Sequence, residues 1–467
     1  MFKKPILACT LALSVVVTPS HALDLMEAYE AALVNDPTFR AAIKDAEAGR
    51  ANLEIGRSGL LPQLSASYYT AQNQSKIAQP AFGSLGGPTV ITDRFYPSNN
   101  SFVQATQVLF NLQALAQFRQ GTAQANLADA KFLYNSQDLL IRVLQAYTDL
   151  LYAQDQHAFL SAQRNALKEQ LSVNERRFAK GEGTITDALE TRAQFELANA
   201  QVIEAKDAIE NAKRKLEAII GAPLQSAEVV KRLRQFKVEP LIPRRFEDWQ
   251  DTALTRNPEI QAVKHAEEVA RQDFQKNIAG NYPVVSAIAS YGQQNSYFIS
   301  TINQNAVTTT VGIQATLPIF NGGQTTGLIS QSRANFEKAQ AQSDEARLRV
   351  ITELRKQYDA VLSSEQKLAA LNRAVESSQQ LIKAMRMSVK GGERINLDVL
   401  VADRTLATAQ RDLAQAKYNY LLASLRLRQQ AGTLTVEDLQ RVAENFQPTS
   451  GAPVPRTVSS PKTLGQR

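Results

Sequence analysis

The chain has 467 residues, a formal net charge of +7 and a single cysteine, Cys9. The mild excess of Lys and Arg is not gathered into a basic stripe with aromatic neighbours, so no nucleic-acid partner is expected. Beyond the first two dozen residues, no stretch of 18 consecutive apolar residues occurs, so no membrane-spanning helix is predicted.

Residues 1–22 are predicted to be a signal peptide. Two lysines precede an apolar stretch from Ile6 to Val17, which is too short to span a bilayer, and Ser20-His21-Ala22 offers small residues where a signal peptidase cuts. Ile6-Leu7-Ala8-Cys9 weakly resembles a lipoprotein cleavage box, but a cut there would leave almost no apolar segment before it. A mature chain beginning near Leu23 has no cysteine, which excludes disulfides and thiolate metal sites. Such an exported chain either stays in or beyond the periplasm or crosses the outer membrane as a closed β-barrel.

The remaining sequence contains one pattern twice. The recurring pairs are Asn35-Asp36-Pro37 with Arg256-Asn257-Pro258, Leu109-Phe110-Asn111 with Ile319-Phe320-Asn321, and Gly221 with Gly432, at a spacing of about 211 residues through the later helices. We therefore expect a first repeat, a connecting equatorial segment, a second repeat, an equatorial C-terminal segment and a proline-rich disordered tail. Their expected ranges are 23–221, 222–245, 246–432, 433–447 and 448–467.

Each repeat is predicted to contain a helix, two strands, a very long helix, a tight turn and a further helix. The expected helices are 24–58, 111–178 and 185–220 in the first repeat, and 246–279, 322–388 and 396–431 in the second. At 1.5 Å per residue, the long helix spans about 100 Å and the two shorter ones together about 105 Å. Two short helices are therefore expected to stack end to end beside one long helix.

The last helix of each repeat has apolar residues at a 3-4 spacing. The two runs extend from Ala188 to Leu216 and from Val399 to Leu427, and large residues recur among alanines in both. A period of 3.5 residues predicts a coiled-coil seam, here within an antiparallel helical hairpin.

Four strands are predicted, over 61–75, 98–110, 281–297 and 305–319. The last alternates most regularly. Its apolar positions run from Val307 to Leu317, and small polar residues from Thr308 to Thr316 occupy the other face. This alternation is typical of a membrane barrel with a wet interior.

Four strands cannot close a barrel, and an open sheet would expose unpaired edges to lipid. The chain is therefore expected to share a barrel with other copies, and three copies give twelve strands. The alternative is a soluble sheet packed against the helices. The helices lack the wide apolar face that such packing needs.

Several motifs resemble the TolC family of outer-membrane export channels, over the chain up to about residue 446. They are Leu317-Pro318-Ile319-Phe320-Asn321-Gly322-Gly323, the second helical turn from Gly392 through Asp398-Val399-Leu400, and the first turn, Arg177-Phe178-Ala179-Lys180-Gly181 with Ile185-Thr186-Asp187. The resemblance implies a homotrimer of mixed α and β class: long helices form a trimeric α-barrel in the periplasm, and four strands per chain contribute to a shared 12-stranded β-barrel in outer-membrane lipid. It also implies a conduit without catalysis. The implied partners are a periplasmic adaptor protein and an inner-membrane transporter, docking at the turns around Gly181 and Gly392.

The same resemblance implies a gate at the hairpin turns. Asp398 matches the family's acidic ring at the periplasmic constriction, and Val401 replaces a second acidic residue one turn later. Arg394 matches a basic residue that bonds across to Thr186 and Asp187, a latch that a partner could break by offering replacement contacts. Either carboxylate can also be an ordinary one that favours a helix start; the two interpretations have equal weight for Asp187, whereas the gate is favoured for Asp398.

No other pattern predicts chemistry. His157 and His265 are isolated helical residues, and no metal-ligand spacing, nucleophilic triad or phosphate loop is present, so no cofactor or metal is expected. Type I protein secretion is the favoured function. Efflux of small molecules, a soluble periplasmic coiled-coil scaffold and, last, an enzyme are the alternatives.

Overall fold

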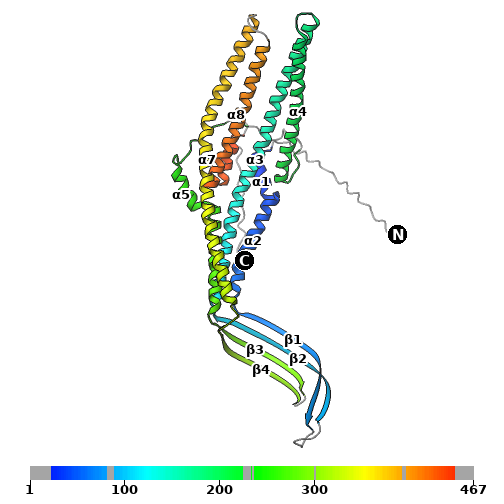
Figure 1. The fold of residues 1–467 in the computed structure, drawn as a ribbon, viewed down its shortest axis with the longest axis vertical. Coiled ribbons are helices and arrows are strands. Elements are labelled where there is room, and N and C mark those ends of the chain that lie inside the picture. The colour runs from blue at the N-terminus through cyan, green and yellow to red at the C-terminus, as the bar shows by residue number, and fades with distance from the viewer. Residues whose placement is uncertain are drawn as a thin grey trace, which may run out of the picture.

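A computed structural model describes residues 23–80, 89–224, 233, 236–298, 301–391 and 396–446. The predicted signal peptide, the predicted tail 448–467 and the residues Gly392 and Arg394 lie outside the described residues. The molecule is elongated, with two helical hairpins at one end and a curved sheet at the other (Figure 1).

The two repeats have the same element order. The first contains α1 (Leu25–Asn35), α2 (Pro37–Ser58), β1 (Gln63–Pro80), β2 (Thr89–Phe110), α3 (Leu112–Ala179) and α4 (Ile185–Ile220). The second contains α5 (Phe246–Arg256), α6 (Pro258–Ile278), the 3-10 turn η2 (Ala279–Asn281), β3 (Val284–Phe298), β4 (Thr301–Thr316), α7 (Gln324–Lys390) and α8 (Asn396–Gln430), and α9 (Val436–Glu444) follows. The predicted long and hairpin helices agree with α3, α4, α7 and α8 to within about two residues at each end, the usual uncertainty of helix boundaries.

The first predicted helix of each repeat is wrong in one respect, because each is broken into two. Asp36 has an extended backbone, with φ −61° and ψ 116°, and its carboxylate accepts a hydrogen bond from the Phe39 amide at 2.9 Å. Asn257, between α5 and α6, is likewise extended, and its side-chain oxygen accepts a hydrogen bond from the Ile260 amide. The proline after each of these residues cannot continue the preceding helix, but it fits the first position of a new one.

The short helices stack end to end along the long ones, as predicted. The Asn35 side chain donates to the Ile220 carbonyl at 2.9 Å, and the Asn257 side chain donates to the Gln430 carbonyl at 2.8 Å. Each hairpin helix thus ends against the break between two shorter helices. Gly221 ends α4 in the left-handed region, where a Cβ would lie 2.4 Å from the Asn35 Cβ.

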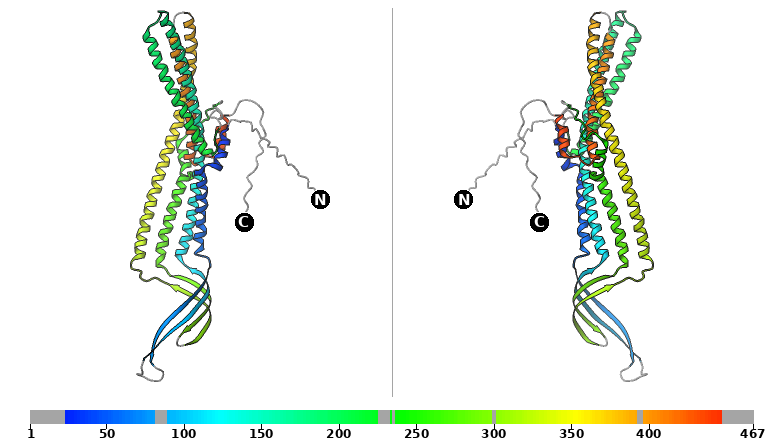
Figure 2. Two further views of the ribbon diagram at one scale, coloured as in Figure 1. Left: turned by 90° about the vertical axis from the view of Figure 1, so that its right-hand side faces the viewer. Right: turned by 90° about the vertical axis from the view of Figure 1, so that its left-hand side faces the viewer.

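The helices form two four-helix layers, one above the other along the length of the molecule. Next to the sheet the order is α2, α3, α6, α7; towards the hairpin ends it is α4, α3, α8, α7 (Figures 1 and 2). The long helices run through both layers, so α2, α4 and α7 are the edges of the molecule. Those edges carry exposed apolar side chains, such as Ile203 on α4 and Leu348 on α7. Within the described residues, no helix is both long and apolar enough to cross a membrane.

The hydrophobic core lies at mid-length, where α1, α3, α4, α8 and α9 meet. The Tyr147 ring packs edge-on against Phe446 at 5.4 Å, and its hydroxyl donates to the Leu23 carbonyl. Tyr358, at the matching position of the second repeat, donates to the Arg244 carbonyl at 2.6 Å. Each long helix therefore anchors the backbone just before the first helix of its own repeat.

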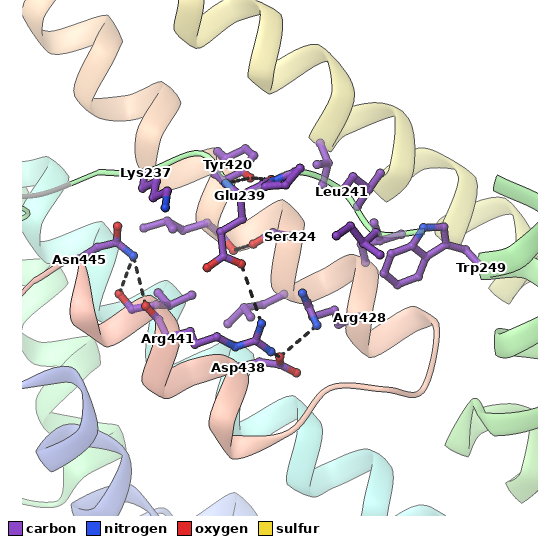
Figure 3. Close-up of a pocket in the computed structure, with 17 residues that line it drawn as sticks. Lys237, Glu239, Leu241, Trp249, Tyr420, Ser424, Arg428, Asp438, Arg441 and Asn445 are labelled. Carbon is purple, nitrogen blue, oxygen red and sulfur yellow. Dashed lines mark hydrogen bonds and ion pairs between the residues drawn. The ribbon is translucent and has the colours of Figure 1, made fainter. Parts of the chain in front are cut away.

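A strap, residues 236–245, crosses α7 and α8 beside α9 (Figure 3). The Tyr420 hydroxyl accepts from the Glu239 amide and donates to the Glu239 carbonyl, and burial raises the pKa of Tyr420 to about 12. Asp438, which is buried, pairs with Arg428 and Arg441. The cavity among these residues has a volume of about 60 Å³, so the strap and α9 form a packed clamp with room for little more than water.

The four strands form one antiparallel sheet in the order β1-β2-β3-β4. The predicted strands are present, but β1 and β2 extend well beyond 61–75 and 98–110. Polar cross-strand pairs stabilise this extension, including Gln74 with Asp93 at 3.2 Å and Ser75 with Tyr96 at 3.4 Å. The β1–β2 hairpin therefore projects past the end of the β3–β4 hairpin (Figure 1).

Candidate functional site: the hairpin ends and the sheet

The turn of the first hairpin follows directly from its sequence. Gly181 has φ +78°, a conformation that glycine adopts without strain, and the Glu182 amide donates to the Arg177 carbonyl at 2.9 Å. Thr184 then caps α4, because its hydroxyl accepts from the Asp187 amide at 3.1 Å. The chain thus reverses direction over five residues, between Ala179 and Ile185.

Side chains tie α3 to α4 just behind this turn. Asn174 donates to the Thr191 hydroxyl at 2.9 Å, and Arg192 pairs with Glu175 at 2.7 Å. The ion pair is more than a third exposed on both sides, so it contributes little to stability. The first hairpin end is held together by modest polar contacts rather than by a large apolar core.

The predicted gate residues lie at the hairpin ends. Thr186 and Asp187 are exposed in the first turn of α4, and Asp398 is half-buried in the first turn of α8. A carboxylate there is favoured by the positive end of the helix dipole. Gly392 and Arg394 lie outside the described residues, so the latch between Arg394 and the Thr186-Asp187 pair stays a prediction.

A groove between the two hairpins was not predicted from the sequence. Leu167, Leu197 and Gln201 line it from the first hairpin, and Val401 and Leu406 line it from α8. Leu197 is 67% exposed and Val401 58% exposed. Neither residue belongs to the 3-4 apolar spacing of its helix. Apolar residues outside that spacing are the signal from which the groove could have been predicted. The partners across the groove are set only by how the hairpins sit together.

The register of the sheet separates an apolar face from a polar one. One row across the four strands is apolar throughout: Leu64, Ala105, Ala289 and Val311. The next row is polar throughout: Ser65, Gln104, Ser290 and Thr310. Directly opposed residues point to the same face, so in these two rows the alternation predicted for the last strand extends across all four strands.

The helices leave the apolar face of the sheet uncovered. Leu64 is 76% exposed, Val311 82% and Ile313 74%. A soluble sheet would bury such side chains against another layer. The alternative of a sheet packed on the helices is therefore wrong for this chain, and both edge strands, β1 and β4, are unpaired on their outer sides within the described sheet.

Titratable groups at these sites show no arrangement for metal binding. Within the part of the chain that the structure describes, no cluster of three or more His, Cys, Asp or Glu residues could hold a metal ion. The site is thus made of turns, exposed apolar faces and single charges, which can bind protein and lipid and can line a pore.

A tall helical body ending in an open sheet with one apolar and one polar face defines an outer-membrane channel protein. The chain belongs to the outer membrane efflux protein family, whose model matches residues 28–222 and 249–433. The TolC-like resemblance is thereby confirmed, and members of this family are channel proteins rather than enzymes.

Relatives match over nearly the full length of the chain. The alkaline protease secretion protein AprF of Pseudomonas aeruginosa is 41% identical over 91% of this chain and 88% of its own. The proteases secretion protein PrtF of Dickeya chrysanthemi is 34% identical over 94% of both. The crystal structure of the Campylobacter jejuni CmeC outer membrane channel has the same fold, with a TM-score of 0.74 at 17% identity over 91% of this chain and 90% of that one.

Proposed function

We propose that this protein is the outer-membrane channel of a type I protein secretion system. The full-length similarity to AprF, whose name describes secretion of an alkaline protease, carries the proposal, and PrtF supports it. The chain would be a passive conduit, energised by its partners and without chemistry of its own. Efflux of small molecules, the other function in the family, is the alternative.

The channel would be a homotrimer with a shared twelve-stranded barrel. The open sheet, its uncovered apolar face and its two unpaired edges support this arrangement, because edge strands in lipid must find partners. Three copies would place β4 of one chain beside β1 of the next. The exposed apolar side chains of α2, α4 and α7 would be covered by neighbouring copies in the same way.

A periplasmic adaptor and an ATP-driven inner-membrane transporter would dock at the hairpin ends, around Gly181 and Gly392. The groove between the hairpins supports the adaptor proposal, since it presents Leu197 and Val401 to solvent beside polar residues. Exposed apolar side chains within a polar rim are typical of protein interfaces.

The gate would lie at the same end. Three copies of Asp398 would form an acidic ring at the narrowest point of the pore, and Arg394 would hold the closed state through Thr186 or Asp187. The helix-start position of both carboxylates and the exposure of Thr186 and Asp187 support this proposal.

A complementation experiment tests the proposed function. The gene would be expressed in a Pseudomonas aeruginosa strain that lacks AprF, with alkaline protease activity measured in the medium and resistance to dyes and antibiotics measured in parallel. We expect protease export to be restored, and the protein to be extracted from outer membranes as a trimer only with detergent. Restored drug resistance without protease export would support efflux, and a monomer released without detergent would support a soluble scaffold.

A further inference from the structure

The strands of this protein and the residues around them carry almost no charge. Asp, Glu, Lys, Arg and His are all absent from three long segments, 58–75, 95–118 and 277–332. These segments contain all of β3 and β4, the part of β2 that pairs with β3, and the part of β1 that lies opposite it. The charges on the strands, Lys76, Asp93 and Arg94, belong to the projecting part of the β1–β2 hairpin.

Membrane insertion explains this absence on one face only. A charge on the lipid-facing side of a barrel is costly, so the row containing Val311 must be uncharged. The opposite face would line a water-filled lumen, where charged residues are tolerated and commonly set ion selectivity. The absence of charge from the row containing Thr310 therefore needs a second cause.

Two large apolar residues on the polar face are each matched with a glycine. Phe102 pairs with Gly292, and Ile288 pairs with Gly312. A Cβ at Gly292 would lie 3.1 Å from the Phe102 Cβ, so a side chain there would crowd the ring. Glycine opposite a large residue removes a second side chain from the same level of the wall. The face is thus uncharged over these segments, and at two levels a glycine keeps a bulky residue from meeting a second one.

We propose that the membrane-spanning wall is kept neutral so that segments of polypeptide cargo carrying either charge pass without being held. The proposal rests on the proposed function as a shared protein-conducting channel. Passage through a pore requires binding that is weak at every level, and a ring of fixed charges in a narrow lumen would retain segments of the opposite sign. Hydroxyl and amide groups can donate and accept hydrogen bonds, so they solvate both kinds of segment. Discrimination by charge would then belong to the helical end of the pore.

Charge introduced at Thr310 tests the proposal. Thr310→Lys and Thr310→Glu each add a ring of three charges, and Thr310→Gln is the matched neutral control of similar length. We expect the reversal potential of bilayer-reconstituted channels to shift towards anions with lysine and towards cations with glutamate. Both charged variants are expected to slow alkaline protease export severalfold, because an unfolded polypeptide carries both positive and negative charges. The glutamine variant is expected to export like wild type.

The position of the charge provides a second control. Ser75→Lys places the same charge in the projecting hairpin, beside Lys76, and is expected to leave export unchanged. If a charge at Thr310 prevents trimer assembly, Ser67→Lys and Ser67→Glu test the same face from β1.

Different results would overturn different statements. Shifted reversal potentials with wild-type export would show that neutrality of the wall does not matter for cargo. Slowed export with glutamine as well as lysine would show that size, not charge, matters. Unchanged reversal potentials would show that this face does not line the lumen. Absence of conductance and export from the wild-type protein would instead contradict the proposed function.

Discussion

Asp187 and Asp398 occupy equivalent positions, since each lies in the first turn of the second helix of a hairpin. The two differ in exposure, because Asp187 is exposed and Asp398 is half-buried. A helix-start carboxylate is worth only about 0.3–1 kcal/mol to the fold at an exposed site. Loss of either side chain should therefore be tolerated by the fold, which makes both residues good probes of the pore.

The first prediction concerns the acidic ring. Asp398→Ala is expected to weaken cation binding and shift ion selectivity towards anions, because it removes three charges from the proposed constriction. Planar-bilayer recordings with a salt gradient measure the shift. Asp207→Ala removes an exposed carboxylate further along α4 and is the control. Equal selectivity in wild type and Asp398→Ala would put the constriction at another level.

The second prediction concerns the latch. Arg394→Ser and Asp187→Ala are each expected to raise single-channel conductance, because either change would break the proposed charge-assisted bond, and such bonds are worth about 1.5–3 kcal/mol. The double variant is expected to add little to either single one. Full additivity, or normal conductance in both single variants, would show that these residues are ordinary helix-end charges. Trimer stability on gels is expected to remain near that of wild type, because the core lies far from the turns.

At the scale of elements, the glycines that end helices differ in what surrounds them. Gly221 and Gly181 both have positive φ, at +72° and +78°. A side chain at Gly221 would collide with Asn35, whereas nothing lies within 4 Å of a side chain at Gly181. The first glycine joins α4 to the α1–α2 break, and the second only turns the chain.

The third prediction separates these two effects. Gly181→Ala is expected to cost about 1–2 kcal/mol, the strain of a left-handed alanine. Gly221→Ala is expected to cost about 1–3 kcal/mol more, because the neighbouring helix break must also shift. The midpoint of thermal loss of helical circular dichroism, in detergent, compares the two variants. Equal midpoints would show that the stacking of α4 on Asn35 is loose.

The sheet offers a matched pair of neighbours on opposite faces. Val311 lies in the apolar row and Thr310 in the polar row. The fourth prediction is that Val311→Arg blocks assembly or insertion, because a charge facing lipid near the midplane costs about 2–4 kcal/mol per copy. Thr310→Arg is expected to assemble, since its face meets water. The change in gel mobility on heating measures the assembly of both variants, and outer-membrane fractionation measures their insertion. Normal insertion of Val311→Arg would show that this face does not meet lipid.

At the scale of the whole molecule, the two repeats share an anchoring contact and pack against each other at mid-length. Tyr147 and Tyr358 make the same type of bond to the backbone before α1 and α5. The segment around α9 brings the second repeat back onto the first: Phe446 reaches the Tyr147 ring, and the Gln137 side chain donates to the Leu434 carbonyl. The mid-length clamp therefore fixes the helices, while the hairpin ends have only a few buried apolar residues, such as Ala188 and Ile382, beside their polar contacts.

The sequence by itself determined the repeat, the long helices, their stacking and the alternation of β4. Each of these depends on periodicity or length within one continuous segment, which local patterns record directly. The helix breaks at Asp36 and Asn257 were available in the same way, because a proline follows each residue.

Only the tertiary structure decided which surfaces meet. The groove between the hairpins joins Leu197 to Val401, and the clamp joins Glu239 to Tyr420. The length of the β1–β2 hairpin depends on polar pairs such as Gln74 with Asp93, which leave no apolar alternation to detect. Such contacts link residues far apart in the chain, and their partners are fixed by the packing of whole helices and strands rather than by any local pattern.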